Sequence, residues 1–477
     1  MSQRVKWGLI LLSLFFSSCA RDYVTGKRTF SLVSESREIE IGREADPQII
    51  AEFGLYDDPK LAAYIDSLGQ AIARVSHRPN LKYTFRVVDS PIVNAFALPG
   101  GWVYFTRGIL AHFNSEAELA GVMGHEVGHV VARHGAEQMS KAQLAGLALN
   151  VGAAVSANFR RLSRVAEMGL GLLFLKFSRG QESEADLLGV EYSTRLGYNA
   201  HQMANFFKTI ARISEKSGQS IPSFLSTHPN PRDREVRIHQ LTDEWQKKIA
   251  FHPNHRRKID YLRRIDGIVY GNDPRQGFVE NGMFYHPQFR FQFPVVRGWQ
   301  VNNSPSAVQM VNKDQTAGIQ FTLGKGRSPR EAADNFLSNV QAEVIEKKSL
   351  SIHGMPAMRV EAILTSQNQN MQVLSHFILK DGQIFVFHGF TSQKSFDKYV
   401  DTFNRVARGF DRLRNRAALS KKPLRVRIRR VRKAGNLATV LKRMGAKPRQ
   451  LDELAILNGL DLKDPVPRGA WIKILHE

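Results

Sequence analysis

The sequence predicts an α+β protein built from several domains. Residues 19–250 are expected to form a mainly helical domain with a small sheet, because apolar residues recur there at helical spacing around a histidine-rich segment. Residues 280–412 alternate in side-chain type at 289–293 and 384–388, which predicts strands, and carry helical patterns over 332–344 and 396–410. An α+β accessory domain is therefore expected after a linker at 251–279. Residues 420–477 follow a basic β-α-α-β pattern and are expected to form a small third domain. A chain of 477 residues with 43% hydrophobic composition can bury two or three cores.

The first 18 residues have the pattern of an export signal. Arg4 and Lys6 precede an apolar run that is too short to remain as a membrane-spanning helix, and two serines stand before Cys19. This pattern predicts a bacterial lipoprotein signal peptide over residues 1–18, with lipid attached to Cys19. By similarity to lipoprotein sorting, Ala20 favours the outer membrane. The alternative is an uncleaved N-terminal anchor.

Charge and cysteine content restrict the partners and the compartment. The formal net charge is +23, which favours anionic partners. For an exported chain these partners are lipid head groups, lipopolysaccharide and the cell wall, and the export signal argues against nucleic acid. Cys19 is the only cysteine, so the chain forms no internal disulfide bond.

A zinc site is predicted at His125-Glu126-Val127-Gly128-His129. The two histidines are four residues apart and share one face of a helix, so both imidazoles can reach one Zn²⁺ at about 2.0–2.1 Å. Glu126 lies between them and can act as general base toward a metal-activated water. Ser115 followed by Glu118 predicts the start of this helix. The alternative is a core helix that carries two histidines and a glutamate without function.

The third ligand is expected from the segment around Glu182. On a helix, Glu182 and Asp186 share a face while Glu184 points away. Glu182 can complete the zinc site, and Asp186 can accept a hydrogen bond from the far nitrogen of a ligating histidine. Alone, the segment could be a solvated acidic helix start, but its presence beside the histidine motif favours the metal site. His134 is expected to lie off the metal face.

The pattern of His125, Glu126, His129, Glu182 and Asp186 resembles the motifs of the gluzincin family of CAAX-prenyl-protease-like metallopeptidases. It is most similar to the family's periplasmic, BepA-like branch. The resemblance implies a zinc-dependent endopeptidase with one Zn²⁺ per chain.

Two further segments support the resemblance. The stretch that begins with Asn94 and Ala95 is similar to the family's substrate-side strand, although its composition fits an ordinary strand equally well. The Thr227-His228-Pro229 segment, with Arg234 six residues after the histidine, is similar to the family's late His-Pro motif. The family would place His228 facing the zinc, as a regulatory fourth ligand or an oxyanion stabiliser, with Arg234 supporting the site. Without the resemblance, His228 would be taken for a loop histidine.

The resemblance also suggests a biological role. The expected activity is degradation of misfolded or stalled envelope proteins, with outer-membrane β-barrel proteins as the favoured clients. The chain would work in the periplasm of a Gram-negative bacterium, anchored to the outer membrane. Two alternatives stay open: a chaperone or assembly scaffold with a latent zinc site, and a cell-wall peptidase.

The C-terminal domain resembles a LysM module, although Ala434-Gly435-Asn436 replaces the usual Gly-Asp-Thr opening. The resemblance implies binding to peptidoglycan through residues 420–477. The alternative is a small basic domain that packs on the protease or on lipid. The middle domain is predicted to be a binding or positioning module.

Overall fold

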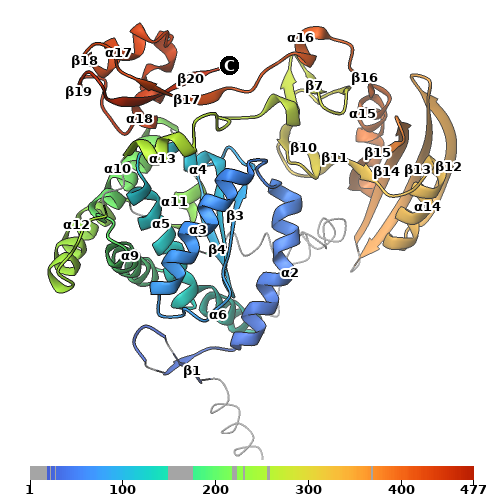
Figure 1. Ribbon diagram of the computed structural model, residues 1–477. Helices are drawn as coiled ribbons and strands as arrows, with labels where there is room; N and C mark the ends of the chain where they lie inside the picture. The colour runs from blue at the N-terminus through green and yellow to red at the C-terminus, as the bar shows by residue number, and fades with distance from the viewer. Residues whose placement is uncertain are drawn as a thin grey trace, which may run out of the picture.

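The computed structural model is an α+β protein (Figure 1). It describes residues 19–148, 176–217, 223–254, 258–366 and 369–477, apart from 22, 27, 229 and 230. The predicted signal segment and the side chain of Cys19 lie outside the described part. Within the described residues, no helix is long and apolar enough to cross a membrane.

The N-terminal region is mainly helical and carries a small sheet, as the sequence predicts. In this sheet β3 (Thr84–Val88) pairs in parallel with β5 (Trp102–Thr106), and β4 (Ala95–Leu98) pairs with the other side of β5 in antiparallel fashion. The β4 strand is therefore an edge strand. The remaining elements are β1 (Cys19–Arg21), β2 (Arg28–Phe30), α2 (Glu35–Phe53), α3 (Pro59–Val75), α4 (Arg107–His112), α5 (Glu116–Val131), α6 (His134–Ala148), α9 (Arg179–Arg195), α10 (His201–Ser217), α11 (Ser223–Thr227), α12 (Pro231–Lys248) and α13 (Lys258–Arg264).

The α5 helix begins where the sequence predicts. The Ser115 hydroxyl accepts a hydrogen bond from the Glu118 N–H at 3.2 Å, which satisfies one of the free amides of the first turn. The Glu118 carboxylate accepts from the Asn114 N–H at 2.8 Å, so it reaches one residue further back than in a reciprocal capping box. All residues of α5 except Ala117 are buried, which places the histidine motif in the core.

The middle region consists mostly of antiparallel sheet. Its seven-stranded sheet has the order β12-β13-β14-β15-β11-β10-β9, and a second sheet of four strands has the order β16-β8-β7-β6. The elements are β6 (Phe278–Glu280), β7 (Met283–His286), β8 (Phe291–Pro294), β9 (Gln300–Asn303), β10 (Ala307–Val311), β11 (Ala317–Gly324), α14 (Pro329–Val340), β12 (Glu343–Ile352), β13 (Met355–Ser366), β14 (Gln369–Lys380), β15 (Gln383–Ser392), α15 (Phe396–Arg408) and β16 (Asp411–Arg412).

One predicted helix of this region is too long. The sequence pattern extends a helix over 332–344, but α14 ends at Val340 because Gln341 adopts a left-handed conformation with φ of 50°. The chain then turns into β12 at Glu343. The reason is tertiary pairing: β12 forms the edge of the large sheet, and this pairing overrides the helical pattern at the end of the segment.

The C-terminal region has the predicted β-α-α-β order and packs on the helical region (Figure 1). Its outer strands β17 (Arg425–Arg430) and β20 (Trp471–His476) form an antiparallel pair. Buried residues of both strands belong to the same hydrophobic cluster as α3, α5 and α10. The other elements are α16 (Arg416–Leu419), β18 (Gly435–Asn436), α17 (Leu437–Arg443), α18 (Leu451–Leu457) and β19 (Pro465–Val466).

A single lysine joins this region to the start of α5. Lys473 of β20 is fully buried, and its ammonium donates to the carbonyls of Ala111 (2.7 Å), Phe113 (2.6 Å) and Leu457 (3.0 Å). Ala111 and Phe113 end α4, directly before the Ser115 cap of α5. A positive charge at a helix C-terminus satisfies carbonyls that have no partner within the helix. The C-terminal strand therefore supports the turn from which α5 starts.

We expect Lys473→Met to lower the free energy of unfolding by about 2 kcal/mol, because three buried carbonyls lose a charged donor. Thermal unfolding, together with limited proteolysis of residues 425–476, measures the loss. The control is Lys463→Met, which changes an exposed lysine of the same region. Equal stability and equal protease resistance of the two variants would show that the buried lysine does not hold the C-terminal region in place.

Candidate metal centre

Two glycines set the distance between α5 and α9. A Cβ on Gly124 would lie 3.0 Å from the carbonyl oxygen of Gly189, and a Cβ on Gly189 would lie 3.0 Å from the amide nitrogen of His125. A side chain at either position would press against the backbone of the other helix and force the two helices apart. Since α5 carries the histidine motif and α9 carries Glu182, this close packing brings the two parts of the predicted site together.

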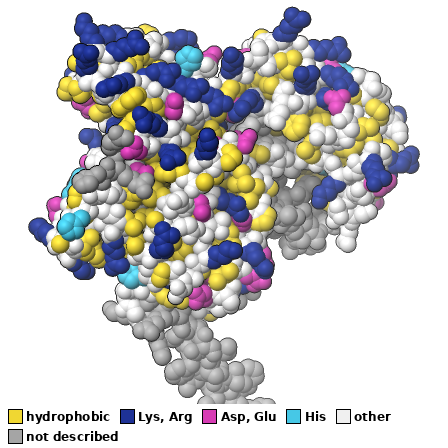
Figure 2. All heavy atoms as spheres, in the orientation of Figure 1, with side chains coloured by type: hydrophobic (Ala, Val, Ile, Leu, Met, Phe, Trp, Pro, Cys, Tyr) yellow, Lys and Arg dark blue, Asp and Glu magenta, His cyan; other side chains and the backbone are white. Residues whose placement is uncertain are grey.

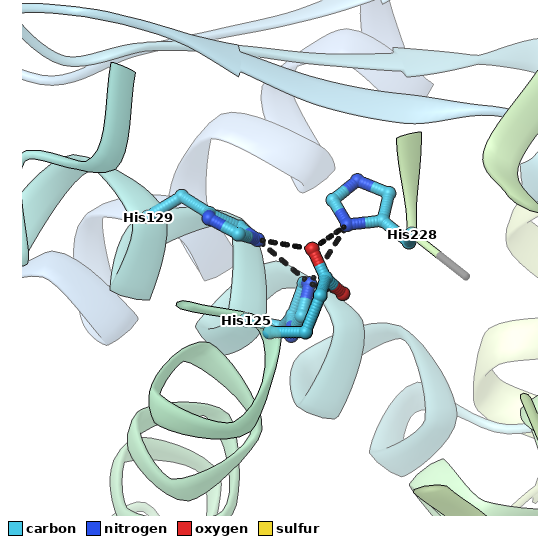
Figure 3. Close-up of side chains that lie close together, drawn as sticks. His125, His129 and His228 are labelled. Atoms are coloured by element: carbon cyan, nitrogen blue, oxygen red, sulfur yellow. Dashed lines mark hydrogen bonds and ion pairs between the residues drawn. The ribbon is translucent and has the colours of Figure 1, made fainter. Parts of the chain in front are cut away.

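Four side chains converge in the resulting core (Figure 3). His125, His129, Glu182 and His228 are all buried and each offers a ligand atom within 4.8 Å of the others. The His125 Nε2 atom lies 3.0 Å from His129 Nε2 and 3.3 Å from His228 Nδ1. Glu182 Oε1 lies 2.9 Å from His228 Nδ1 and 3.5 Å from His129 Nε2.

These separations fit a tetrahedral metal ion. Ligand atoms placed about 2.0–2.1 Å from one zinc ion are separated by about 3.3 Å along the edges of the tetrahedron. The donor set of three imidazoles and one carboxylate is also one that zinc prefers. In addition, the buried Glu126 Oε1 atom lies 3.6 Å from His228 Nε2 and accepts no hydrogen bond within the described residues, which leaves it able to accept one from a bound water.

A second layer of charged groups holds the ligands. Asp186 Oδ1 lies 3.1 Å from His125 Nδ1, as expected for a carboxylate that orients a ligating imidazole. Arg234 donates two hydrogen bonds to Asp186, at 2.6 and 2.9 Å, and lies 2.9 Å from Glu182 Oε2. The structure therefore brings together all the residues that the sequence proposes around the metal.

The charges of this cluster favour metal binding. Burial raises the pKa of a carboxyl, but the Arg234 charge and His125 outweigh it and hold the pKa of Asp186 well below its usual range. Burial likewise opposes ionisation of Glu182, yet His228 and Arg234 lower its pKa. Burial and the neighbouring histidines lower the pKa of His129 far below its ordinary value, which keeps the imidazole neutral. Ionised carboxylates and neutral imidazoles are the forms that bind a metal.

Two other groups in the cluster behave differently. Burial raises the pKa of Glu126, as suits a group that must take up a proton. Burial lowers the pKa of His228, but the adjacent Glu182 and Glu126 outweigh it, so the pKa is raised overall. His228 therefore carries positive charge more readily than His129.

His134 supports the site from outside the ligand set. It lies off the metal face, as the sequence predicts, but the sequence does not show that its Nδ1 atom lies 2.8 Å from His129 Nδ1 and its Nε2 atom 3.3 Å from a Glu184 carboxylate oxygen. The left-handed conformation of Arg133, with φ of 59°, ends α5 and turns the next residue back toward it. A helical projection cannot show this contact, because His134 belongs to the next helix. His134 and Glu184 thus support His129 as Asp186 and Arg234 support His125.

A small pocket of about 10 Å³ lies beside the cluster, at one end of the edge strand. It is lined by Ala97 and Leu98 of β4, by His129 and by Phe177, whose ring stacks on His129 at 4.2 Å between centroids. Asn94 and Ala95 are buried at the other end of the strand, where the Asn94 amide donates to Thr106. The β4 residues that face this pocket therefore follow the two that the sequence singles out.

Gly189→Ala is expected to destabilise the protein by about 1–3 kcal/mol and to weaken metal binding, because the added methyl separates α9 from α5. Chemical unfolding and zinc titration against a chelator measure the two effects. Gly180→Ala is the matched control in the same helix, since the nearest atom to its added methyl is 3.8 Å away. Similar behaviour of the two variants would mean that close packing at Gly189 does not position Glu182.

His134→Ala is expected to lower zinc affinity about tenfold, because His129 loses the group that orients its ring. The measurement is zinc competition with a chelator, which reports on the site without requiring catalysis. Glu184→Gln leaves a group that can still form a hydrogen bond with His134 Nε2, so it should lower zinc affinity less. Unchanged zinc affinity in His134→Ala would leave that histidine with a purely structural role.

Comparison with known proteins agrees with this geometry. The family model for peptidase family M48 matches residues 59–244. The chain is 33% identical over 205 residues to a "Putative beta-barrel assembly-enhancing protease" of Vibrio cholerae, covering 41% of each chain. It is 31% identical over 219 residues to the "Beta-barrel assembly-enhancing protease" of Escherichia coli K12, covering 44% of each. The chain thus spans less than half the length of these two relatives.

A third relative is matched over more of its length. The chain is 30% identical over 228 residues to the "Mitochondrial metalloendopeptidase OMA1" of Schizosaccharomyces pombe, covering 47% of this chain and 67% of that one. The similarity to all three relatives involves less than half of the present chain.

Proposed function

We propose that this chain, which belongs to peptidase family M48, is a zinc metalloendopeptidase that cleaves polypeptides. The observation that carries the proposal is the buried group of His125, His129, Glu182 and His228, whose ligand atoms all lie within 4.8 Å of one another, with Glu126 Oε1 3.6 Å from His228 Nε2. His125, His129 and Glu182 would hold one Zn²⁺ per chain.

The residues around the metal divide the chemistry among them. When bound, Zn²⁺ acidifies a water molecule and polarises the substrate carbonyl. Glu126 takes the proton of the attacking water and passes it to the leaving amine, and its raised pKa suits both steps. Asp186 and Arg234 keep His125 and Glu182 in position throughout.

In this proposal, His228 regulates access of the substrate to the metal. Its Nδ1 atom lies among the ligand atoms, 2.9 Å from Glu182 and 3.3 Å from His125. A catalytic zinc site needs an open position, and His228 occupies the place where a fourth ligand would bind. We infer that this arrangement is the closed state and that His228 must move before substrate binds. In the open state it would be free to stabilise the oxyanion.

The substrate is proposed to bind as an extended strand. The β4 edge carries no further strand in the described structure, and its Ala97 and Leu98 line the small pocket beside His129. Extended peptides commonly add to such an edge through backbone hydrogen bonds. Unfolded polypeptides offer many unpaired extended segments, whereas most extended segments of a folded protein are already paired in its sheets.

The biological role follows from combining these features with the relatives. We propose that the clients are misfolded or stalled envelope proteins, in particular outer-membrane β-barrel proteins, because two relatives are named as β-barrel assembly-enhancing proteases. The signal pattern at residues 1–18 supports a periplasmic location with a lipid anchor on Cys19. The closed His228 position also favours a second candidate, a chaperone or assembly scaffold whose zinc site is latent.

Glu126→Gln separates these two functions. We expect it to bind as much zinc as the wild type but to cleave unfolded casein or an unfolded barrel protein at least about 100-fold more slowly, because the base is lost. Zinc content is measured on both proteins by elemental analysis. If both bind zinc and the wild type also fails to cleave, the latent-scaffold function replaces the peptidase; cleavage by Glu126→Gln would remove Glu126 as the base.

A further inference from the structure

A basic groove lies on the C-terminal region, away from the zinc centre. It has a volume of about 1020 Å³. Four apolar residues, Val431, Val440, Met444 and Ile474, line it together with six cationic residues. The cationic residues are Arg429, Arg430, Arg432, Lys433, Arg443 and Arg468.

The fold brings these six cations together from three parts of the chain. Four lie at the end of β17 and in the turn after it, Arg443 ends α17, and Arg468 precedes β20. All six are exposed. Lys and Arg side chains accordingly gather over the C-terminal region at the top of the molecule (Figure 2).

These charges are not neutralised by the protein itself. No acidic residue lines the groove, and none of the six cations forms an ion pair within the described residues. Other arginines of this chain do have carboxylate partners: Arg78 pairs with Glu35, and Arg234 pairs with Asp186. A concave surface lined by one sign of charge attracts counter-ions strongly, so the groove has the electrostatics of a polyanion site.

The groove combines its charge with an apolar lining. Trp471 lies beside it, with the guanidinium of Arg430 5.9 Å from its ring centre. A neutral glycan would leave six cations without partners. Three of the apolar residues are already buried: Val431, Val440 and Ile474. Met444 and Trp471 are partly exposed, and a purely hydrophilic polyanion would leave these two uncovered. A ligand that carries both phosphate and hydrocarbon matches both parts.

We propose that this groove binds the head group of an anionic phospholipid. The arginines contact its phosphate, for which the planar guanidinium is well suited, and the partly exposed Met444 and Trp471 contact the glycerol and the first part of the acyl chains. Arginine and tryptophan side chains are typical of protein surfaces that contact the membrane interface.

The position of the groove gives this contact two consequences. It lies at the opposite end of the molecule from β1, which begins at Cys19 (Figure 1), so it is separate from the proposed lipid anchor. The groove is also next to a core residue in sequence. Ile474 lines the groove, and the preceding Lys473 donates hydrogen bonds to the carbonyls of Ala111 and Phe113, directly before α5. Lipid bound in the groove would therefore rest against the strand that supports the zinc helix.

The test measures binding of the purified full chain to phosphatidylcholine vesicles with and without phosphatidylglycerol. We expect binding to be at least about tenfold tighter when phosphatidylglycerol is present, since an acylated Cys19 would contribute equally to binding of both kinds of vesicle. The variant R432E/R443E/R468E should bind at least about tenfold more weakly, since each basic residue near an anionic membrane contributes several-fold to the affinity. The control K313E/R330E/K394E changes net charge equally on exposed positions of the middle region and should lose less than about twofold.

Several outcomes would overturn the proposal. Equal losses in both triple variants would reduce the effect to overall charge. Groove-dependent binding to purified sacculi without vesicle binding would assign the groove to peptidoglycan, and tighter groove-dependent binding of duplex DNA than of vesicles would assign it to nucleic acid. Competition by millimolar glycerol phosphate as strong as that by intact lipid would remove the role of the apolar lining.

Should the triple variant misfold, R432Q and R468Q are each expected to weaken vesicle binding two- to fivefold. Wild-type affinity in both variants would refute the site.

Discussion

The close contact between α5 and α9 is the constraint on which the zinc centre depends. Two helices can approach this closely only where neither carries a side chain, and Gly124 and Gly189 meet this condition. The contact places the start of α9, with Glu182, beside the histidines of α5. Larger side chains at these two positions would leave the two histidines of α5 too far from the Glu182 carboxylate for the three groups to bind one ion.

Around this contact the protein buries more charge than an apolar core tolerates without compensation. Glu126, Glu182 and Asp186 are buried among three histidines, and Arg234 is the cation that links two of the carboxylates. Buried charges are stable only when they are paired or bind a metal. The pairing explains why Arg234, distant in sequence from the histidine motif, belongs to the site. Glu126 Oε1, which accepts no hydrogen bond within the described residues and lies 3.6 Å from His228 Nε2, marks the place of the chemistry.

Local patterns in the sequence predicted part of this organisation. The start of α5, the helical face shared by His125 and His129, and the face shared by Glu182 and Asp186 all depend on spacing within one helix, so a single sequence is sufficient. The contact of His134 with His129 crosses a helix boundary at Arg133, and the insertion of Lys473 into the core joins residues about 360 positions apart; neither has a local signature. The same limit explains why the helix predicted over 332–344 extends into β12, where sheet pairing decides the structure.

The central claim is that the buried cluster holds one zinc ion through nitrogen and oxygen ligands of this chain. Zinc X-ray absorption spectroscopy on the purified protein, combined with the zinc-to-protein ratio, tests it most directly. The account predicts one zinc per chain with four nitrogen or oxygen neighbours at about 2.0–2.1 Å and the multiple-scattering signature of imidazole. A six-coordinate oxygen shell without imidazole, or protein that retains no zinc after purification, would contradict it.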